Sequence, residues 1–146
     1  MKIFLIVILI VGSLLSCSKN ENRLNGDFPH TYKLTKMTAS FNGQEITGTD
    51  MEWQETYCLF ENNTFIKTRI WNGNNTEATG MYSFTIIDNK SFIEFTYNVE
   101  STIIGSCYGN LKEIMDVISD TKIISTWSYC DGPGLEYERI AVCGTN

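Results

Sequence analysis

Eight short segments rich in β-branched and aromatic residues follow one another between residues 30 and 142. Turn-forming residues separate them, such as Asn42-Gly43 after the first segment and Asp88-Asn89-Lys90 between the fourth and the fifth. Connections of this length leave no room for crossover helices, so consecutive segments are expected to pair as antiparallel strands. The expected strands cover residues 30–41, 55–60, 64–71, 78–87, 91–98, 111–118, 121–129 and 135–142.

The segment 111–118 admits a second interpretation. Its apolar residues fit helical spacing, and Asn110 with Glu113 imitates a helix-capping box. The segment is short, however, and Ser119-Asp120 leads directly into the clear strand 121–129. We therefore interpret residues 111–118 as a strand.

Eight antiparallel strands in succession can close on themselves, which removes both edges of the sheet. The sequence therefore predicts an all-β fold, an antiparallel up-and-down eight-stranded barrel. A two-sheet β-sandwich is the alternative, because it accommodates the same succession of short strands.

The connections between the segments differ in length in a regular way. In a meander, the connections after even-numbered and odd-numbered strands lie at opposite ends. One end should therefore be pinched shut and the other ringed by loops, where binding sites concentrate. The tight turns cover residues 61–63, 88–90 and 119–120, and the longer connections cover 42–54, 72–77, 99–110 and 130–134.

The first twenty residues have the order of a secretory signal. Lys2 supplies a positive charge, residues 3–11 form an apolar run too short to span a bilayer, and small residues lead to Cys17. Leu14-Leu15-Ser16-Cys17 resembles the bacterial lipobox, in which the cysteine is lipidated and becomes the first mature residue. The resemblance implies a signal peptide over residues 1–16 and a membrane anchor of acyl chains, palmitate among them, on Cys17.

Ser18 stands where the signal for retention at the inner membrane would be Asp, which favours the outer membrane of the bacterial cell envelope. The polar residues that follow lack any apolar period. Residues 17–27 are therefore interpreted as a lipidated flexible tether, and residues 28–146 as the barrel domain. The tether would enter the first strand at the pinched end, so the loops would point away from the membrane.

Removal of residues 1–16 takes away Lys2 alone among the charged residues, which changes the net charge from −6 to −7. Scattered Lys and Arg residues in an acidic chain argue against nucleic acid, whereas a basic partner protein would be attracted.

One histidine and the lack of nucleophile and phosphate-binding motifs indicate a non-catalytic protein without metal or cofactor. Glu94, Glu113 and Asp116 could form a carboxylate pair, but on strands they are expected to face solvent.

With Cys17 lipidated, four cysteines remain, and in an exported domain they suggest two disulfides. Spacing alone leaves the connectivity open, and a zinc site, the rival interpretation, lacks the paired close spacings of zinc motifs. In the barrel, Cys107 precedes the sixth strand and Cys130 follows the seventh, so both lie at the loop-bearing end. We expect a Cys107–Cys130 pair, which leaves Cys58 for Cys143.

Three segments carry a family resemblance. Thr31-Tyr32-Lys33-Leu34-Thr35, Phe60 through Phe65, and Gly80-Met81-Tyr82-Ser83-Phe84 resemble recurring segments of lipocalin-like domains in small bacterial lipoproteins. In lipocalins, an arginine of the last strand packs over the tryptophan of a Gly-x-Trp motif. His30-Thr31-Tyr32 occupies that place here, so the resemblance implies Arg139 over Tyr32. The alternative for Arg139 is a solvated strand residue.

Six aromatic residues fall toward the expected loop-bearing end: Trp53, Trp71, Tyr97, Tyr108, Trp127 and Tyr129. They could form an aromatic mouth that grips a ligand, or they could be ordinary core and rim packing. The first functional hypothesis is a membrane-anchored lipocalin-like binding module for a small hydrophobic ligand at the barrel mouth. The alternative is a protein-interaction or inhibitor lipoprotein that binds a basic partner protein.

Overall fold

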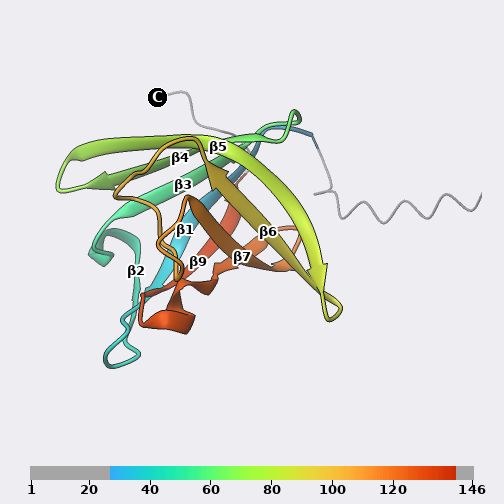
Figure 1. Cartoon of the computed structure of the whole chain (residues 1–146). Coiled ribbons are helices and arrows are strands. Elements are labelled where there is room, and N and C mark those ends of the chain that lie inside the picture. The colour runs from blue at the N-terminus through green and yellow to red at the C-terminus, as the bar shows by residue number, and fades with distance from the viewer. Residues whose placement is uncertain (1–26, 141–146) are drawn as a thin grey trace, which may run out of the picture.

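The computed structural model describes residues 27–140 of the chain. The predicted signal peptide, the predicted lipidation site Cys17 and Cys143 lie outside the described residues. Figure 1 shows an all-β molecule whose strands wrap around one interior.

The described residues form one antiparallel sheet whose first strand pairs with its last (Figure 1). Eight strands close the predicted barrel in the order β1-β3-β4-β5-β6-β7-β8-β9, and β2 pairs with β1 outside the ring. Two 3-10 segments, η1 (Gly48–Asp50) and η2 (Thr126–Cys130), lie in connections. The strands are β1 (His30–Thr38), β2 (Glu45–Thr47), β3 (Gln54–Leu59), β4 (Thr64–Trp71), β5 (Asn74–Ile87), β6 (Lys90–Tyr97), β7 (Lys112–Ser119), β8 (Lys122–Ser125) and β9 (Gly134–Ile140).

The ring closes where β1 pairs with β9, from Thr31 to Thr38. Tyr32 and Arg139 are register partners there, so the two residues lie side by side on neighbouring strands. The Tyr32 hydroxyl donates a hydrogen bond to the backbone carbonyl of Asp120 at 3.0 Å. Burial raises the pKa of Tyr32 to about 12, against the opposing effect of the Arg139 charge. Closure removes the exposed edges that an open sheet would present.

The structure confirms one of the expected strands and shortens another. The ambiguous segment 111–118 is a strand, β7, as predicted. The expected strand over residues 121–129 is wrong in its second half, because β8 ends at Ser125. The Ser125 hydroxyl oxygen accepts the backbone N–H of Trp127 at 3.1 Å, and this cap begins η2.

The connection expected over residues 72–77 is shorter than predicted. Asn72 and Gly73 form a two-residue turn with φ values of 49° and 76°, and Trp71 pairs directly with Asn74. Asn and Gly tolerate this left-handed backbone, which suits a tight hairpin. The connection over residues 42–54 also differs, because it holds β2 and η1, which the sequence pattern did not predict.

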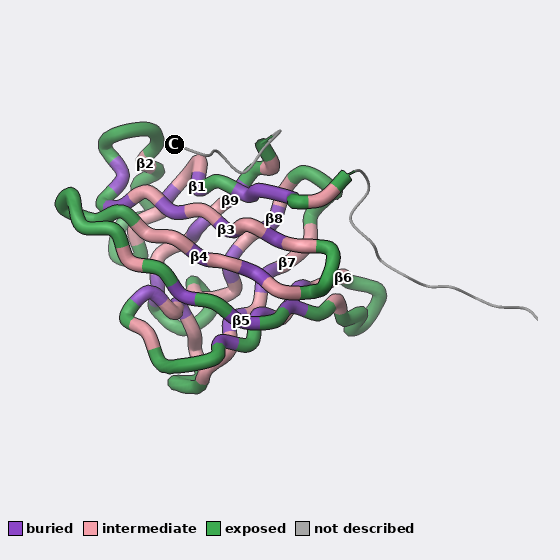
Figure 2. The backbone as a smooth tube through the Cα atoms, turned by 90° about the horizontal axis from the view of Figure 1, so that it is seen from above, coloured by how far each residue is buried: buried purple, intermediate pink, exposed green. Residues whose placement is uncertain are grey.

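Large side chains fill the interior of the barrel, and Figure 2 shows buried positions recurring along the strands. The Phe95 ring lies 4.7 Å from the ring of Tyr57 and 4.8 Å from that of Phe65, centroid to centroid. Space is so limited that a Cβ on Gly80 would lie 2.0 Å from the carbonyl oxygen of Thr96. The largest fully buried side chains are Tyr32, Tyr57, Tyr137, Phe65, Lys67, Phe95, Leu34, Leu59, Ile93, Met115, Ile123 and Leu135.

The two ends of the barrel differ. The turns between β3 and β4, β5 and β6, and β7 and β8 are tight and lie at the end where β1 begins, since His30 pairs with Leu59. We call this the turn end. The opposite end, which we call the loop end, consists of residues 39–53, 72–73, 98–111 and 126–133.

Candidate functional site

A cluster of charged side chains lies inside the barrel toward the loop end. Glu55 on β3, Lys67 on β4 and Glu113 on β7 are at most 2% exposed, and Arg69 is 11% exposed. The Lys67 ammonium lies 3.1 Å from Glu55 Oε1 and 2.7 Å from Glu113 Oε1. Arg69 Nε lies 2.5 Å from Glu55 Oε2. Two carboxylates therefore face two cations, which is how buried charges are tolerated.

Three tyrosine hydroxyls donate hydrogen bonds to the same carboxylates. Tyr57 and Tyr97 both donate to Glu113 Oε2, the former at 2.6 Å, and Tyr137 donates to Glu55 Oε1 at 2.6 Å. Burial and then the nearby carboxylate charges raise the pKa of each tyrosine above its ordinary value. The hydroxyls therefore keep their protons and remain donors at neutral pH.

The position of Glu113 corrects an expectation from the sequence. Glu94, Glu113 and Asp116 were all expected to face solvent, but Glu113 faces the interior because its pairing in β7 places it among inward positions. The expectation holds for the other two. Glu94 pairs with Lys112 at 2.7 Å, and Asp116 accepts a hydrogen bond from the Tyr129 hydroxyl at 2.7 Å.

Residues 98–111, here called the cap loop, cover the charged cluster at the loop end. Ile103 is 2% exposed, and its carbonyl oxygen accepts hydrogen bonds from Lys67 Nζ at 2.6 Å and Arg69 Nη2 at 3.2 Å. The backbone N–H of Gly105 donates to Glu113 Oε1. The cap loop thus supplies backbone partners to the cluster, and the chain's own atoms fill the mouth of the barrel.

A disulfide joins the cap loop to η2. Cys107 and Cys130 form the predicted pair, with Cα atoms 5.6 Å apart. The second predicted pair, Cys58 with Cys143, stays a prediction because Cys143 lies outside the described residues.

Trp127 packs between the cap loop and the connection that leads into β9. A Cβ on Gly105 would lie 2.5 Å from its indole ring, and a Cβ on Gly132 would lie 2.4 Å from it. Glycine at both positions therefore lets the indole fit against backbone on two sides. The disulfide and this packing together fix the cap loop to η2.

The structure divides the six predicted ligand-binding aromatics between interior and surface. Trp53 and Tyr97 are buried, and Arg69 stacks over the Trp53 ring at 4.3 Å from its centroid. Trp127 is half-buried against the core. Exposed on the surface are Trp71, Tyr108 and Tyr129. The six residues therefore do not line one mouth. The cap loop fills the mouth instead, so a ligand inside the barrel would have to displace that loop.

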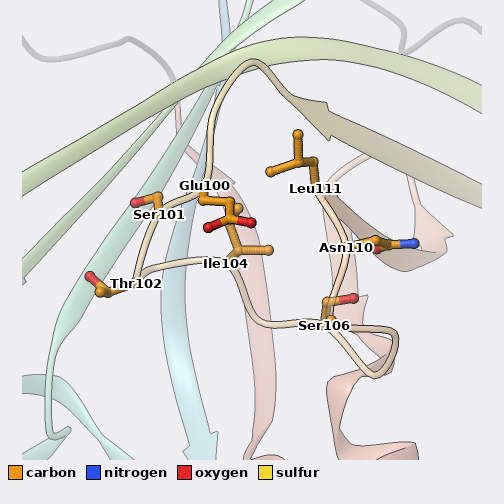
Figure 3. Close-up of a pocket in the computed structure, with 8 residues that line it drawn as sticks. Glu100, Ser101, Thr102, Ile104, Ser106, Asn110 and Leu111 are labelled. Atoms are coloured by element: carbon orange, nitrogen blue, oxygen red, sulfur yellow. The ribbon is translucent and has the colours of Figure 1, made fainter.

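Hollows lie on the outer surface of the described residues. One of about 790 Å³ lies on the outer face of β1, β3, β4 and β5, and includes Thr56, Cys58 and Ile66. Another of about 590 Å³ lies beside the turn between β3 and β4. A third of about 570 Å³ lies in the cap loop, where Glu100 and Leu111 line it (Figure 3). The third belongs to the loop end.

The loop end is acidic. Its segments contain five acidic residues, all exposed, and no Lys or Arg. The nearest lysine on β1, Lys36, is paired with Glu136 at 2.6 Å and Glu45 at 2.7 Å, and these hydrogen bonds raise its pKa. Lys36 therefore offsets the charge of Glu45, and the four carboxylates that have no ion pair within residues 27–140 give the loop end a negative field. The five residues are Glu45, Asp50, Glu52, Glu100 and Asp131.

Residues 27–140 contain no cluster of three His, Cys, Asp or Glu side chains placed to hold a metal ion. Within the same range, no helix has the length and apolar character needed to cross a membrane. No family model, curated protein or solved structure matches the chain. The resemblance to lipocalin-like domains stays a prediction, and the function is argued from the loop end itself.

Proposed function

We propose that the chain is a non-catalytic, lipid-anchored lipoprotein of the bacterial outer membrane that binds a basic partner protein through its loop end. The observation that carries the proposal is the charge of that end, with five exposed carboxylates and no Lys or Arg. Opposite charge accelerates the encounter of two proteins and disfavours acidic competitors.

Exposed aromatic side chains support the same surface. Tyr108 in the cap loop is 71% exposed, Tyr129 in η2 is 75% exposed, and Phe41 in the β1–β2 connection is fully exposed. Tyrosine and phenylalanine are enriched in protein interfaces, where a rigid ring buries much area at low entropic cost. Tyr108 and Tyr129 directly flank the Cys107–Cys130 disulfide, which fixes their backbones.

The predicted anchor suits this orientation. Cys17 would hold the chain at the membrane, and residues 18–26 then allow a reach of at most about 35 Å to Asp27. Because β1 begins at the turn end, the tether reaches the barrel there. The loop end would therefore face away from the membrane, where a partner has access.

Because the cap loop fills the mouth of the barrel, binding of a basic partner protein is better supported than binding of a small hydrophobic ligand inside the barrel. A ligand inside the barrel would have to lift the cap loop and strip Lys67 and Arg69 of the Ile103 carbonyl oxygen. Loss of a partner from a buried charged group costs about 1–3 kcal/mol or more. A partner at the loop end requires no such opening.

Site-specific photocrosslinking in the producing bacterium tests the proposal. A photoreactive residue replaces Tyr108 at the loop end or, as a matched control, Ile87, which is 55% exposed at the turn end. We expect position 108 to yield an adduct with a basic protein that added salt suppresses, and position 87 to yield none with that protein. Adducts of equal yield from both positions, or none from position 108, would contradict the proposal.

A further inference from the structure

The hollow in the cap loop combines one carboxylate with an apolar floor. In Figure 3, the cap loop forms a ring, and the Glu100 side chain extends into its middle above Ile104. Leu111 faces Glu100 from the other limb of the ring. The hollow has a volume of about 570 Å³ and opens to the outside. A narrow side chain can therefore enter it from solvent.

The carboxylate of Glu100 is available to an incoming cation. Within residues 27–140, Glu100 takes part in no hydrogen bond or ion pair. Two other carboxylates of the outer surface are already paired, since Glu94 contacts Lys112 and Glu136 contacts Lys36 and Lys122. A charged ligand can pair with Glu100 without breaking a contact inside the protein.

The floor of the hollow suits an alkyl stem. Ile104 and Leu111 are partly buried and pack against the core, so their exposed atoms offer a firm apolar surface. Lysine and arginine carry three or four methylene groups below their charge, and these groups pack on apolar surface while the charge stays wet. A cationic side chain matches both the floor and the carboxylate.

The hollow is held in shape before any ligand arrives. Asn110 Oδ1 accepts the backbone N–H of Lys112 at 3.2 Å, and Ser106 Oγ accepts that of Tyr108 at 3.1 Å. The Cys107 disulfide fixes the same stretch of the loop. Little ordering is therefore needed on binding, and preorganisation of this kind increases affinity.

We propose that this hollow is the anchor site for one lysine or arginine side chain of the basic partner. The alkyl stem packs between Ile104 and Leu111, and the charge pairs with Glu100. The inference rests on the proposed function and names the contact by which the loop end would recognise its partner.

Titration of the full mature protein in detergent micelles, followed by ¹⁵N NMR, tests the site. The probes are three Gly-Ser peptides that differ at one central residue, which is arginine, lysine or norleucine. Both cationic peptides should shift the backbone resonances of Glu100, Ile104 and Leu111, and the norleucine peptide should not. The stronger of the two cationic peptides identifies which side chain the hollow prefers.

Two charge variants separate the hollow from the general field of the loop end. Glu100→Gln should weaken the binding of the cationic peptides by about tenfold, which is the loss of affinity expected for one hydrogen bond to a charged group. Asp131→Asn removes the same charge from the same end, outside the residues that line the hollow, and should change affinity by less than about twofold.

Equal weakening in the two variants, or resonance shifts away from the cap loop, would overturn the anchor site. The proposed function would survive that result if photocrosslinks from position 108 still captured a basic protein. Absence of those crosslinks would instead count against the proposed function.

Discussion

The Lys67 ammonium lies 2.7 Å from Glu113 Oε1 and joins β4 to β7 across the interior, where both side chains are at most 2% exposed. The same ammonium donates to the carbonyl oxygen of Ile103 in the cap loop at 2.6 Å. One cation thus links two strands of the barrel to the segment that closes its mouth. A substitution that disturbs this cation should therefore affect the barrel and the cap loop at the same time.

Glu113→Gln should destabilise the protein by about 3–5 kcal/mol, because it leaves buried positive charge without one of its two carboxylates. Chemical denaturation measures this loss. Glu94→Gln, which breaks the exposed pair with Lys112, is the matched control and should cost less than about 1 kcal/mol. Similar small losses in both variants would show that the buried cluster contributes little.

Alkaline pH should unfold the protein steeply. Burial raises the pKa of Tyr57, Tyr97 and Tyr137 in the folded state, so above pH ~10 the unfolded chain loses these protons first. The contribution of these hydroxyls to the free energy of unfolding is fully present below that pH. Above it the contribution falls by up to about 1.4 kcal/mol per pH unit for each tyrosine. Urea unfolding at a series of alkaline pH values gives the slope. Tyr97→Phe should make the fall in the free energy of unfolding with pH shallower. An unchanged slope would show that Tyr97 does not have the raised pKa described here.

Removal of the Cys107–Cys130 disulfide should loosen the cap loop first. The double variant Cys107→Ser with Cys130→Ser opens a covalent loop of sequence separation 23 and should cost about 3 kcal/mol. Hydrogen exchange should accelerate in residues 98–111, whereas β3 and β4 should stay protected. Uniform acceleration throughout the barrel would show that the cap loop has no independent motion.

Gly80→Ala should destabilise the barrel by about 2 kcal/mol or more, because the new Cβ would lie 2.0 Å from the carbonyl oxygen of Thr96. Gly43→Ala is the matched control. Its φ of 66° disfavours alanine, but the space around it is open, so the cost should be about 1 kcal/mol. Thermal unfolding of the two variants tests the difference. A smaller loss at Gly80 than at Gly43 would mean that β5 and β6 are not packed as described.

The barrel could be predicted because its turns depend on residues that are adjacent in the sequence. Asp88 and Asn89 are examples, since their positive φ values suit a tight hairpin. The buried cluster could not be found from residue type, since a glutamate on a strand usually faces water. Alternation carried a weak signal, because Lys67 shares a face with buried Phe65, and Glu113 shares one with buried Met115. Pairing those charges across the interior needed the register of distant strands.

The end of β8 was missed for a different reason. Residues 121–129 are rich in residues that favour strands, yet the Ser125 cap starts η2 and the strand stops. The cap is useful only because Trp127 then packs against Gly105 and Gly132, which lie elsewhere in the chain. A local pattern cannot show such a tertiary contact.

The proposed role of the loop end as a recognition surface is tested most directly by the affinity for an oligolysine peptide at low and high salt. One variant replaces Glu52, Glu100 and Asp131 at the loop end by their amides. The matched variant does the same at the turn end, for Glu61, Asp88 and Asp120. We predict that the loop-end variant loses at least about tenfold in affinity at low salt, whereas the turn-end variant changes by less than about twofold. Equal losses in the two variants would contradict a recognition surface at the loop end.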